Sequence, residues 1–284
     1  MASGVAIRCL DGNPDQFGAV MALPRMKPQD GVAWVTGASS GIGAAVALEL
    51  ARRGWTVAVT ARRFEQLEAL AREAENLRGR IVVHAGDVTD MASMRGVVAA
   101  VETVHGPIAL AFLNAGIASG NHGSPLDLDA VEQTMSVNFM GVVKGVSAIL
   151  DAMQKRRRGQ IAVNASLVGY RGLPGTAAYG ASKAAAIHLC ESLHFDCEAH
   201  GIRLQVVNPG FVDTPMTRRN RFTMPFLMSA EESAGRIVDG FERSGFEITF
   251  PRRLAWLLRI GRSLPYGVYF ALMSRAARRS LRGS

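Results

Sequence analysis

Short runs of apolar, often β-branched residues alternate with longer helical stretches from residue 31 to residue 250, and this alternation constrains the fold most. The strand candidates are Val32–Thr36, Thr56–Thr60, Arg80–Ala85, Ile108–Leu113, Gln160–Asn164, Arg203–Val207 and Phe246–Phe250. Segments with a 3.6-residue period lie between them, namely Ala44–Arg53, Phe64–Leu77, Met91–Val104 and Val131–Met153. Nearly continuous apolar strands separated by helices indicate a parallel sheet covered on both faces. The order therefore predicts an α/β fold, a doubly wound Rossmann-type three-layer sandwich with a mostly parallel seven-stranded sheet.

The pattern divides the chain into a central domain and two extensions. Residues 31–250 contain no internal repeat or linker and are predicted to form one Rossmann-type domain. Residues 1–30 are rich in Pro and lack the apolar run of a secretory signal, which predicts a flexible N-terminal extension. Residues 251–284 form an Arg-rich C-terminal extension.

The cysteines and the apolar segments indicate where such a chain acts. The three cysteines, Cys9, Cys190 and Cys197, make no closely spaced framework, so we expect reduced thiols and a cytoplasmic location. The sequence contains no stretch of 18 or more uncharged apolar residues, which argues against a membrane-spanning helix.

Charge is unevenly distributed along the chain. The formal net charge is +8, and the last acidic residue is Glu247. All the excess lies beyond it, in eight arginines: Arg252, Arg253, Arg259, Arg262, Arg275, Arg278, Arg279 and Arg282. The first 247 residues therefore have no net charge, which argues against nucleic acid as a partner of the main domain.

The C-terminal extension combines this charge with apolar residues at helical spacing. Arginines alternate with Leu, Trp and Ile over residues 251–262, Pro265 interrupts the pattern, and Tyr266–Met273 is apolar before a second Arg-rich stretch. Such a helix can lie on an anionic membrane as a peripheral anchor. It can equally pack its apolar face on the body or on a sister subunit. The sequence leaves both interpretations open.

A glycine-rich loop joins the first predicted strand to the first helix. It reads Thr36-Gly37-Ala38-Ser39-Ser40-Gly41-Ile42-Gly43. Gly37 suits a tight turn, Gly41 allows backbone to approach a pyrophosphate, and Gly43 allows close helix packing. The helix N-terminus supplies unpaired N–H groups for phosphate, so Gly37, Ser39, Ser40, Gly41, Ile42 and Gly43 are predicted to hold a dinucleotide.

This loop resembles the cofactor loop of the short-chain dehydrogenase/reductase family in its standard form. The motifs described below resemble further segments of the same family. The resemblance covers residues 31–250. It implies a nicotinamide cofactor and reversible hydride transfer between a carbonyl and a secondary alcohol. It also implies a homodimer or homotetramer built partly on the helix that starts at Tyr179.

The end of the second strand bears on which cofactor binds. It reads Val59-Thr60-Ala61-Arg62-Arg63, without the carboxylate that accepts the ribose hydroxyls of NAD. A guanidinium binds a 2′-phosphate well, so we expect NADP(H) rather than NAD(H). The resemblance assigns the phosphate contact to Arg62. The alternative is that Arg62 and Arg63 only open a solvated helix.

The resemblance assigns the rest of the cofactor site to three further strand ends. It implies that Asp87 meets the adenine amino group and that Val88 lies over the ring. It places Asn114, Ala115 and Gly116 beside the adenosine ribose, where they also brace the sheet. The segment after the sixth strand would wrap the nicotinamide through Pro209, Gly210, Val212 and Thr214.

The candidate reacting groups follow the fifth strand. Tyr179 and Lys183 are four residues apart on one helical face, and an ammonium beside the phenol is expected to lower its pKa. Ser166, at the end of the strand, can hydrogen-bond a carbonyl oxygen while Tyr179 transfers the proton. The resemblance implies that Asn138 holds a water molecule that links Lys183 to solvent. The alternative is that Asn138 makes only a structural hydrogen bond.

These residues together predict an NADP(H)-dependent oxidoreductase with Tyr179 as general acid and base. The alternative is a catalytically silent NADP(H)-binding sensor or scaffold on the same fold. The substrate, a small carbonyl or alcohol, is expected between 167–174 and 215–228, where Arg218, Arg219 and Arg221 either hold an anionic group or face water. No His, Cys and carboxylate cluster has the spacing of a metal site, so none is expected.

Overall fold

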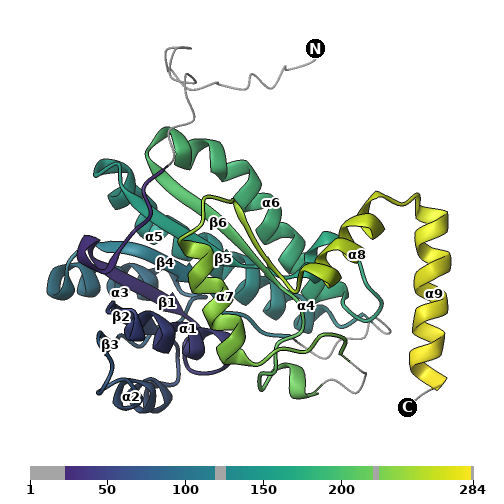
Figure 1. The fold of residues 1–284 in the computed structure, drawn as a ribbon, viewed down its shortest axis with the longest axis horizontal. Coiled ribbons are helices and arrows are strands. Elements are labelled where there is room, and N and C mark those ends of the chain that lie inside the picture. Colours follow the sequence, from purple (N-terminus) through teal and green to yellow (C-terminus); the bar gives the residue numbers. More distant parts are fainter. Residues whose placement is uncertain (1–22, 119–125, 220–223, 283–284) are drawn as a thin grey trace.

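The computed structural model of the chain describes residues 23–118, 126–219 and 224–282. Its strands are β1 (Val32–Thr36), β2 (Thr56–Thr60), β3 (Arg80–Val83), β4 (Ile108–Leu113), β5 (Gly159–Asn164), β6 (Ile202–Pro209) and β7 (Glu247–Phe250). Its helices are α1 (Gly41–Arg52), α2 (Phe64–Glu73), α3 (Met91–His105), α4 (Leu128–Met135), α5 (Gly141–Lys155), α6 (Ala177–Ala199), α7 (Ala230–Phe241), α8 (Arg252–Ser263) and α9 (Tyr266–Arg282). Short turns η2 (Pro28–Asp30), η3 (Ser136–Met140), η4 (Leu167–Tyr170) and η5 (Thr217–Arg219) complete the described elements (Figure 1).

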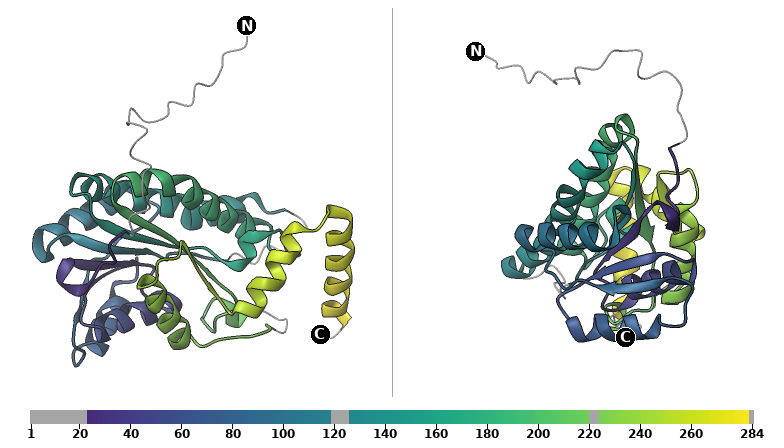
Figure 2. Two further views of the ribbon diagram at one scale, coloured as in Figure 1. Left: turned by 45° about the horizontal axis from the view of Figure 1, so that its top comes forward. Right: turned by 90° about the vertical axis from the view of Figure 1, so that its left-hand side faces the viewer.

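The seven strands form one sheet in the order β3-β2-β1-β4-β5-β6-β7, and every pairing is parallel. One face packs on α1, α2 and α7, and the other on α3, α5 and α6, which gives the three layers seen in Figure 2. The predicted fold is therefore confirmed. Chain order reverses between β1 and β4, and ligands of open α/β sheets bind beyond the carboxyl ends of the strands at such a point.

Each strand predicted from the sequence is present: β1, β2 and β4 have the predicted ends, and the ends of the others differ by at most two residues. The long predicted helix 131–153 is instead α4, the π-helical turn η3 and α5 in succession. π-Turns occur frequently at functional sites because they re-aim a side chain within a helix. Here the turn contains Asn138, which is fully buried.

The α4-to-α5 stretch, Leu128–Lys155, is long and apolar enough to cross a membrane by length and composition alone. A third of its most apolar window is buried in the fold, and its parts pack against α3 and α6. We therefore interpret it as a helix of the folded domain.

The packed part of the chain begins before residue 31 and continues past residue 250. Met26 is buried in the core, and its backbone N–H donates to Oε1 of Gln160 at 3.2 Å. At the other end, α8 packs against β7 and η4. Of the cysteines, Cys190 and Cys197 are free and buried, and Cys9 lies outside the described residues.

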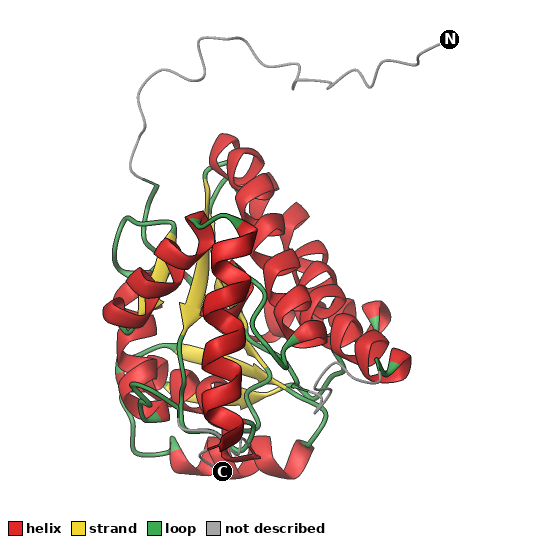
Figure 3. Ribbon diagram, turned by 90° about the vertical axis from the view of Figure 1, so that its right-hand side faces the viewer, coloured by secondary structure: helices red, strands yellow, loops and turns green. Residues whose placement is uncertain are grey.

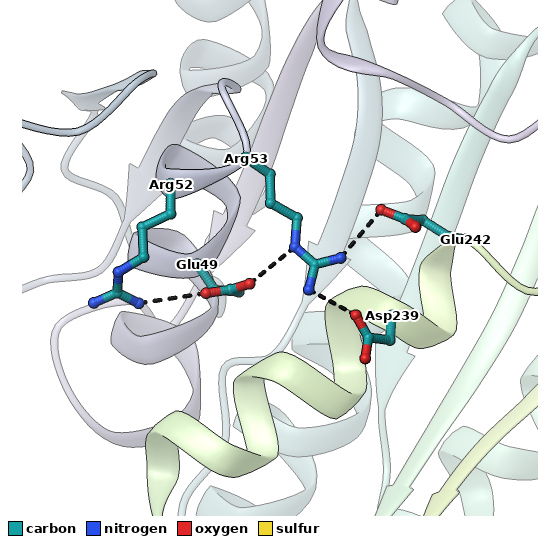
Figure 4. A network of polar contacts seen from close by, with 5 residues as sticks. All are labelled: Glu49, Arg52, Arg53, Asp239 and Glu242. Carbon is teal, nitrogen blue, oxygen red and sulfur yellow. Dashed lines mark hydrogen bonds and ion pairs between the residues drawn. The ribbon is translucent and has the colours of Figure 1, made fainter.

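An ion-pair network joins α1 to α7 across one face of the sheet (Figure 4). The Arg53 guanidinium contacts Glu49 at 2.9 Å, Asp239 at 2.6 Å and Glu242 at 3.1 Å. Burial disfavours the charged form of Arg53, but the hydrogen bonds to these three carboxylates outweigh it and raise the pKa of Arg53.

We expect Arg53→Ala to lower the free energy of unfolding by about 1–2 kcal/mol, because it leaves three carboxylates without their shared cation. Arg52→Ala is the matched control, since Arg52 makes one exposed pair with Glu49 at 3.4 Å. We expect the control to cost less than about 0.5 kcal/mol. Urea unfolding of both variants measures the difference, and equal midpoints would contradict a stabilising role for the network.

Candidate active site

The glycine-rich loop has the geometry that the sequence predicts. Gly37 and Gly41 have positive φ values of +67° and +59°, which glycine adopts without strain. A Cβ on Gly43 would lie 2.4 Å from the Gly37 carbonyl oxygen, so the helix start and the loop approach too closely for a side chain. Ser40 precedes α1 without capping it through its side chain. The first backbone N–H groups of α1 therefore lie close to the glycine-rich loop and have no side-chain cap from Ser40.

Asn114 fixes this loop to the middle of the sheet. Its Nδ2 donates to the carbonyl oxygens of Thr36 and Gly37 at 3.1 and 3.2 Å, and its backbone N–H donates to the Thr36 hydroxyl at 3.0 Å. Its Oδ1 accepts from Nδ2 of Asn164 at 2.8 Å. The predicted bracing role of the segment 114–116 is thus present, and it links the ends of β1, β4 and β5.

A cleft of about 520 Å³ opens along the carboxyl ends of β1, β2, β4, β5 and β6. This volume lies in the range of about 300–1,000 Å³ that is typical of ligand pockets. The predicted residues that line it are Gly37, Ser39, Ser40, Gly41, Ile42, Arg62, Arg63, Asp87, Val88, Asn114, Ala115, Gly116, Ser166, Tyr179, Lys183, Pro209, Gly210, Val212 and Thr214. Gly43 and Asn138 are not among the lining residues. Gly43 packs against Gly37, and Asn138 is hydrogen-bonded to Ile117; both of these partners line the cleft.

The two arginines after β2 have different surroundings. Arg63 donates through Nη2 to the hydroxyls of Ser39 at 2.8 Å and Ser40 at 3.3 Å, so it bridges β2 to the glycine-rich loop. Arg62 lies near Asp87 and helps to lower its pKa. The sequence singles out Arg62, whereas the structure shows that Arg63 is the arginine in contact with the loop serines.

The Asp87 carboxylate accepts hydrogen bonds from the Thr89 backbone N–H at 2.9 Å and hydroxyl at 2.8 Å. Burial acts to raise its pKa, but these hydrogen bonds and the nearby Arg62 and Lys144 lower it. Asp87 is therefore an ionised residue at the rim of the cleft. Its neighbour Val88 is buried against Gly141 of α5.

Tyr179, Lys183 and Ser166 meet at the other end of the cleft. The Lys183 Nζ lies 5.7 Å from the centroid of the Tyr179 ring and donates to the Asn164 carbonyl oxygen at 2.7 Å. Ser166 Oγ accepts from the Val168 N–H at 3.2 Å and donates to the Pro209 carbonyl oxygen at 3.5 Å, and the nearby Ser166 hydroxyl acts to lower the pKa of Tyr179. The helix α6 and the end of β5 thus bring the three groups together.

The predicted direction of the Tyr179 pKa is wrong for this structure. Burial raises the pKa of Tyr179, and the hydrogen bond with Ser166 offsets this only in part. Burial also lowers the pKa of Lys183 to about 8. Withdrawal from water acts on both groups and favours their neutral forms, an effect that side-chain spacing alone does not show. The phenol therefore carries its proton at neutral pH.

Asn138 makes the structural hydrogen bonds that the sequence leaves as an alternative. Its Oδ1 accepts from the Ile117 N–H at 2.7 Å, and its Nδ2 donates to the Ile117 carbonyl at 2.9 Å and to the Ser182 hydroxyl at 3.0 Å. The π-turn thereby ties the segment after β4 to α6, one residue before Lys183.

The substrate side of the cleft includes Pro215, Met216 and Thr217. Arg218 lies outside it and forms an ion pair with Asp213 at 2.7 Å, which argues against a role in holding an anionic substrate group. Arg221 falls outside the described residues. Within the described ranges, no group of three or more His, Cys, Asp or Glu side chains is placed to hold a metal ion.

Comparison with known proteins assigns the family. The profile of the short chain dehydrogenase family matches residues 31–224, which is more than half of the chain. This chain belongs to the short-chain dehydrogenase family. An uncharacterised oxidoreductase of Myxococcus xanthus is 37% identical over 243 residues, covering 86% of this chain and 96% of the relative.

Two solved structures match the fold of this short-chain dehydrogenase. An alcohol dehydrogenase from Thermococcus sibiricus, complexed with 5-hydroxy-NADP, has a TM-score of 0.70 and 26% identity over 77% of this chain and 95% of that one. A short-chain dehydrogenase/reductase from Burkholderia phymatum, in complex with NAD, has a TM-score of 0.73 and 22% identity over 80% and 91% of the two chains. The chain is thus an oxidoreductase of a family that uses nicotinamide cofactors.

Two residues that organise the site, Thr217 and Asn164, are not among those predicted from the sequence. Thr217 organises the last loop, because its hydroxyl donates to the Val212 carbonyl at 2.6 Å and accepts from the Thr214 N–H at 3.0 Å. Asn164 holds both Lys183 and Asn114. Its position as the last residue of a predicted strand, at the sheet edge where ligands bind, is the signal that could have found it.

Proposed function

We propose that this dehydrogenase interconverts a carbonyl and a secondary alcohol with NADP(H), and that Tyr179 carries the proton. The observation that supports this most strongly is the convergence of Tyr179, Lys183 and Ser166 at one end of a cleft whose other end is a phosphate-binding loop. When bound, the nicotinamide supplies or accepts the hydride.

The geometry of the cleft is itself suited to a dinucleotide. The positive φ values of Gly37 and Gly41 and the close approach at Gly43 all favour glycine, so side chains leave the backbone of the loop uncovered. The start of α1 supplies N–H groups and a positive dipole end for a pyrophosphate. We propose Arg63, with the Ser39 hydroxyl and the neighbouring Arg62, as the site of the 2′-phosphate, because a guanidinium beside a hydroxyl is a strong donor set for phosphate. This is the basis for NADP(H) over NAD(H).

In carbonyl reduction, the protonated phenol of Tyr179 donates to the oxygen that becomes negative, and Ser166 hydrogen-bonds the same oxygen. The Lys183 ammonium stabilises the phenolate that remains. Asn138 is a positioning residue, because its hydrogen bonds to Ile117 and Ser182 fix α6 relative to the segment after β4. The same groups work in reverse for alcohol oxidation.

The pKa directions predict the pH dependence of each reaction. Below pH about 8, Lys183 is charged and Tyr179 is protonated, so kcat/KM for reduction should be flat around neutral pH. Above pH about 8, Lys183 loses its proton, and the rate of carbonyl reduction should fall. Alcohol oxidation needs the phenolate, so its rate should rise as pH increases. Initial rates in both directions over this range measure the two profiles, and parallel profiles would contradict the assignment.

A panel of carbonyl compounds with NADPH, followed by NADPH absorbance, tests the proposal as a whole. We expect turnover of at least one class of carbonyl. Binding of NADPH without turnover of any member would favour the catalytically silent alternative. We propose further that the enzyme acts in the cytoplasm. We also propose that it is a homodimer or homotetramer, and sedimentation velocity measures this oligomeric state directly.

A further inference from the structure

The two C-terminal helices form a surface that the proposed reaction does not use. We define the C-terminal elbow as α8, the connecting Leu264 and Pro265, and α9. Figure 2 shows that the strands point toward the end of the molecule where the elbow lies, and Figure 3 shows α9 across that end. The elbow therefore occupies the same end of the sheet as the cleft.

The elbow is fixed to the loop that follows Ser166. Arg171 donates to the carbonyl oxygens of Gly261 at 2.6 Å and Leu264 at 2.7 Å, where α8 ends. Its guanidinium lies 4.0 Å from the Tyr269 ring centroid and 4.9 Å from that of Tyr266. The buried Tyr269 hydroxyl donates to the Gly172 carbonyl at 2.7 Å. These contacts hold both helices in a defined position beside the active site.

Large apolar side chains are exposed on both helices of the elbow. On α8, Trp256 is 65% exposed and Leu257 is 61% exposed, and Ile260 lies one turn further on the same side. On α9, Val268 and Phe270 are also at least half exposed. Large apolar side chains gathered on one element mark an interaction surface rather than ordinary exposed residues.

The charge of the elbow has a single sign. No acidic residue follows Glu247, and the eight arginines beyond it have no lysine or carboxylate among them. Arg259 pairs with Glu247 and so helps to hold α8 in place. Arg252 and Arg253 are exposed beside the apolar side chains, and in the ranges that the structure covers neither has an acidic partner.

These features together select one kind of partner. The same surface of a second copy would bring arginine against arginine, which disfavours self-association through it. Nucleic acid would match the charge but would leave the exposed Trp, Leu, Ile and Phe side chains in water. An anionic bilayer matches both, because apolar side chains enter the headgroup region while arginines contact lipid phosphates.

We propose that the C-terminal elbow docks the dehydrogenase on anionic lipid bilayers, with α8 and α9 lying in the membrane interface. This docking turns the end of the sheet that carries the cleft toward the bilayer. It is a binding property and is measured without cofactor or substrate, so its failure would leave the proposed reaction untouched.

The test is co-sedimentation of the full-length protein with vesicles of phosphatidylcholine alone or mixed with phosphatidylglycerol. We expect pelleting with the anionic vesicles only, decreasing as salt is raised. The apolar variant is Trp256→Ser/Leu257→Ser/Ile260→Ser, with Val104→Ser on α3 as its matched control, because Val104 is 68% exposed on the neutral domain. We expect the triple variant to partition at least about tenfold less and the control to be unchanged.

Charge is tested separately with Arg252→Glu/Arg253→Glu, and with the same reversal at two exposed arginines of the domain, Arg95→Glu/Arg243→Glu, as control. We expect only the elbow variant to lose at least about tenfold in binding, since each basic residue near an anionic surface contributes on the order of 1 kcal/mol. Equal binding by elbow and control variants would overturn the proposal. So would a full-length protein that ignores the vesicles but dissociates into smaller species when the elbow is changed, as measured by sedimentation velocity.

Discussion

Replacing Tyr179 with Phe should reduce NADPH-dependent carbonyl reduction by about 10²–10⁴-fold, because the variant removes the proton donor and leaves the rest of the cleft intact. Tyr179 is held by α6, beside the Lys183 Nζ and in the part of the cleft that Ser166 also lines. The ring of Phe fills the same space without the hydroxyl. The loss should therefore appear in kcat, and steady-state rates on any carbonyl that the wild type reduces will measure it.

NADPH affinity separates this outcome from a folding defect. The phosphate loop and Arg63 are at the other end of the cleft, so fluorescence titration should give a dissociation constant for NADPH close to that of the wild type. A Tyr179→Phe variant that retains turnover within tenfold of the wild type would show that another group carries the proton.

The second large effect concerns cofactor choice. Arg63→Ala should raise the KM for NADPH by about 10–100-fold and leave the KM for NADH nearly unchanged, since a charge-assisted hydrogen bond contributes about 1.5–3 kcal/mol. The reason is the position of Arg63, whose guanidinium contacts the Ser39 and Ser40 hydroxyls on the loop.

Two further variants show whether this effect belongs to Arg63. Arg62→Ala should have a smaller effect, because the structure shows Arg62 near Asp87 and not in contact with the loop serines. Arg72→Ala, in the last turn of α2, the helix that follows Arg63, removes an exposed cation outside the cleft and should change neither constant. A larger loss in Arg62→Ala than in Arg63→Ala would reverse the assignment.

The fold could be predicted because its determinants are local. Apolar strands of five or six residues between amphipathic helices leave few arrangements other than a covered parallel sheet. The same holds for groups whose spacing is set by one element, such as Tyr179 and Lys183 on α6. Residues at the carboxyl ends of strands could be assigned to the cleft because parallel strands bring these ends to one edge.

The parts that could not be predicted depend on contacts between distant segments. Arg62 and Arg63 are adjacent in sequence, and only the path of the chain into α2 decides which one reaches the loop serines. The hydrogen bonds of Asn138 depend on a π-turn that helical periodicity does not reveal. The pKa directions of Tyr179 and Lys183 depend on how deeply the folded chain buries them. The Arg171 contacts with the elbow join residues about 90 positions apart.

Transfer of a labelled hydride tests the central claim most directly. The enzyme is supplied with NADPH in which both hydrogens at the reactive carbon of the nicotinamide are replaced by deuterium, together with a carbonyl from the panel. Mass spectrometry then locates the label in the product. We predict one deuterium on the carbinol carbon with the wild type, and its near absence with Tyr179→Phe. Alcohol formed by the wild type without deuterium would contradict the account.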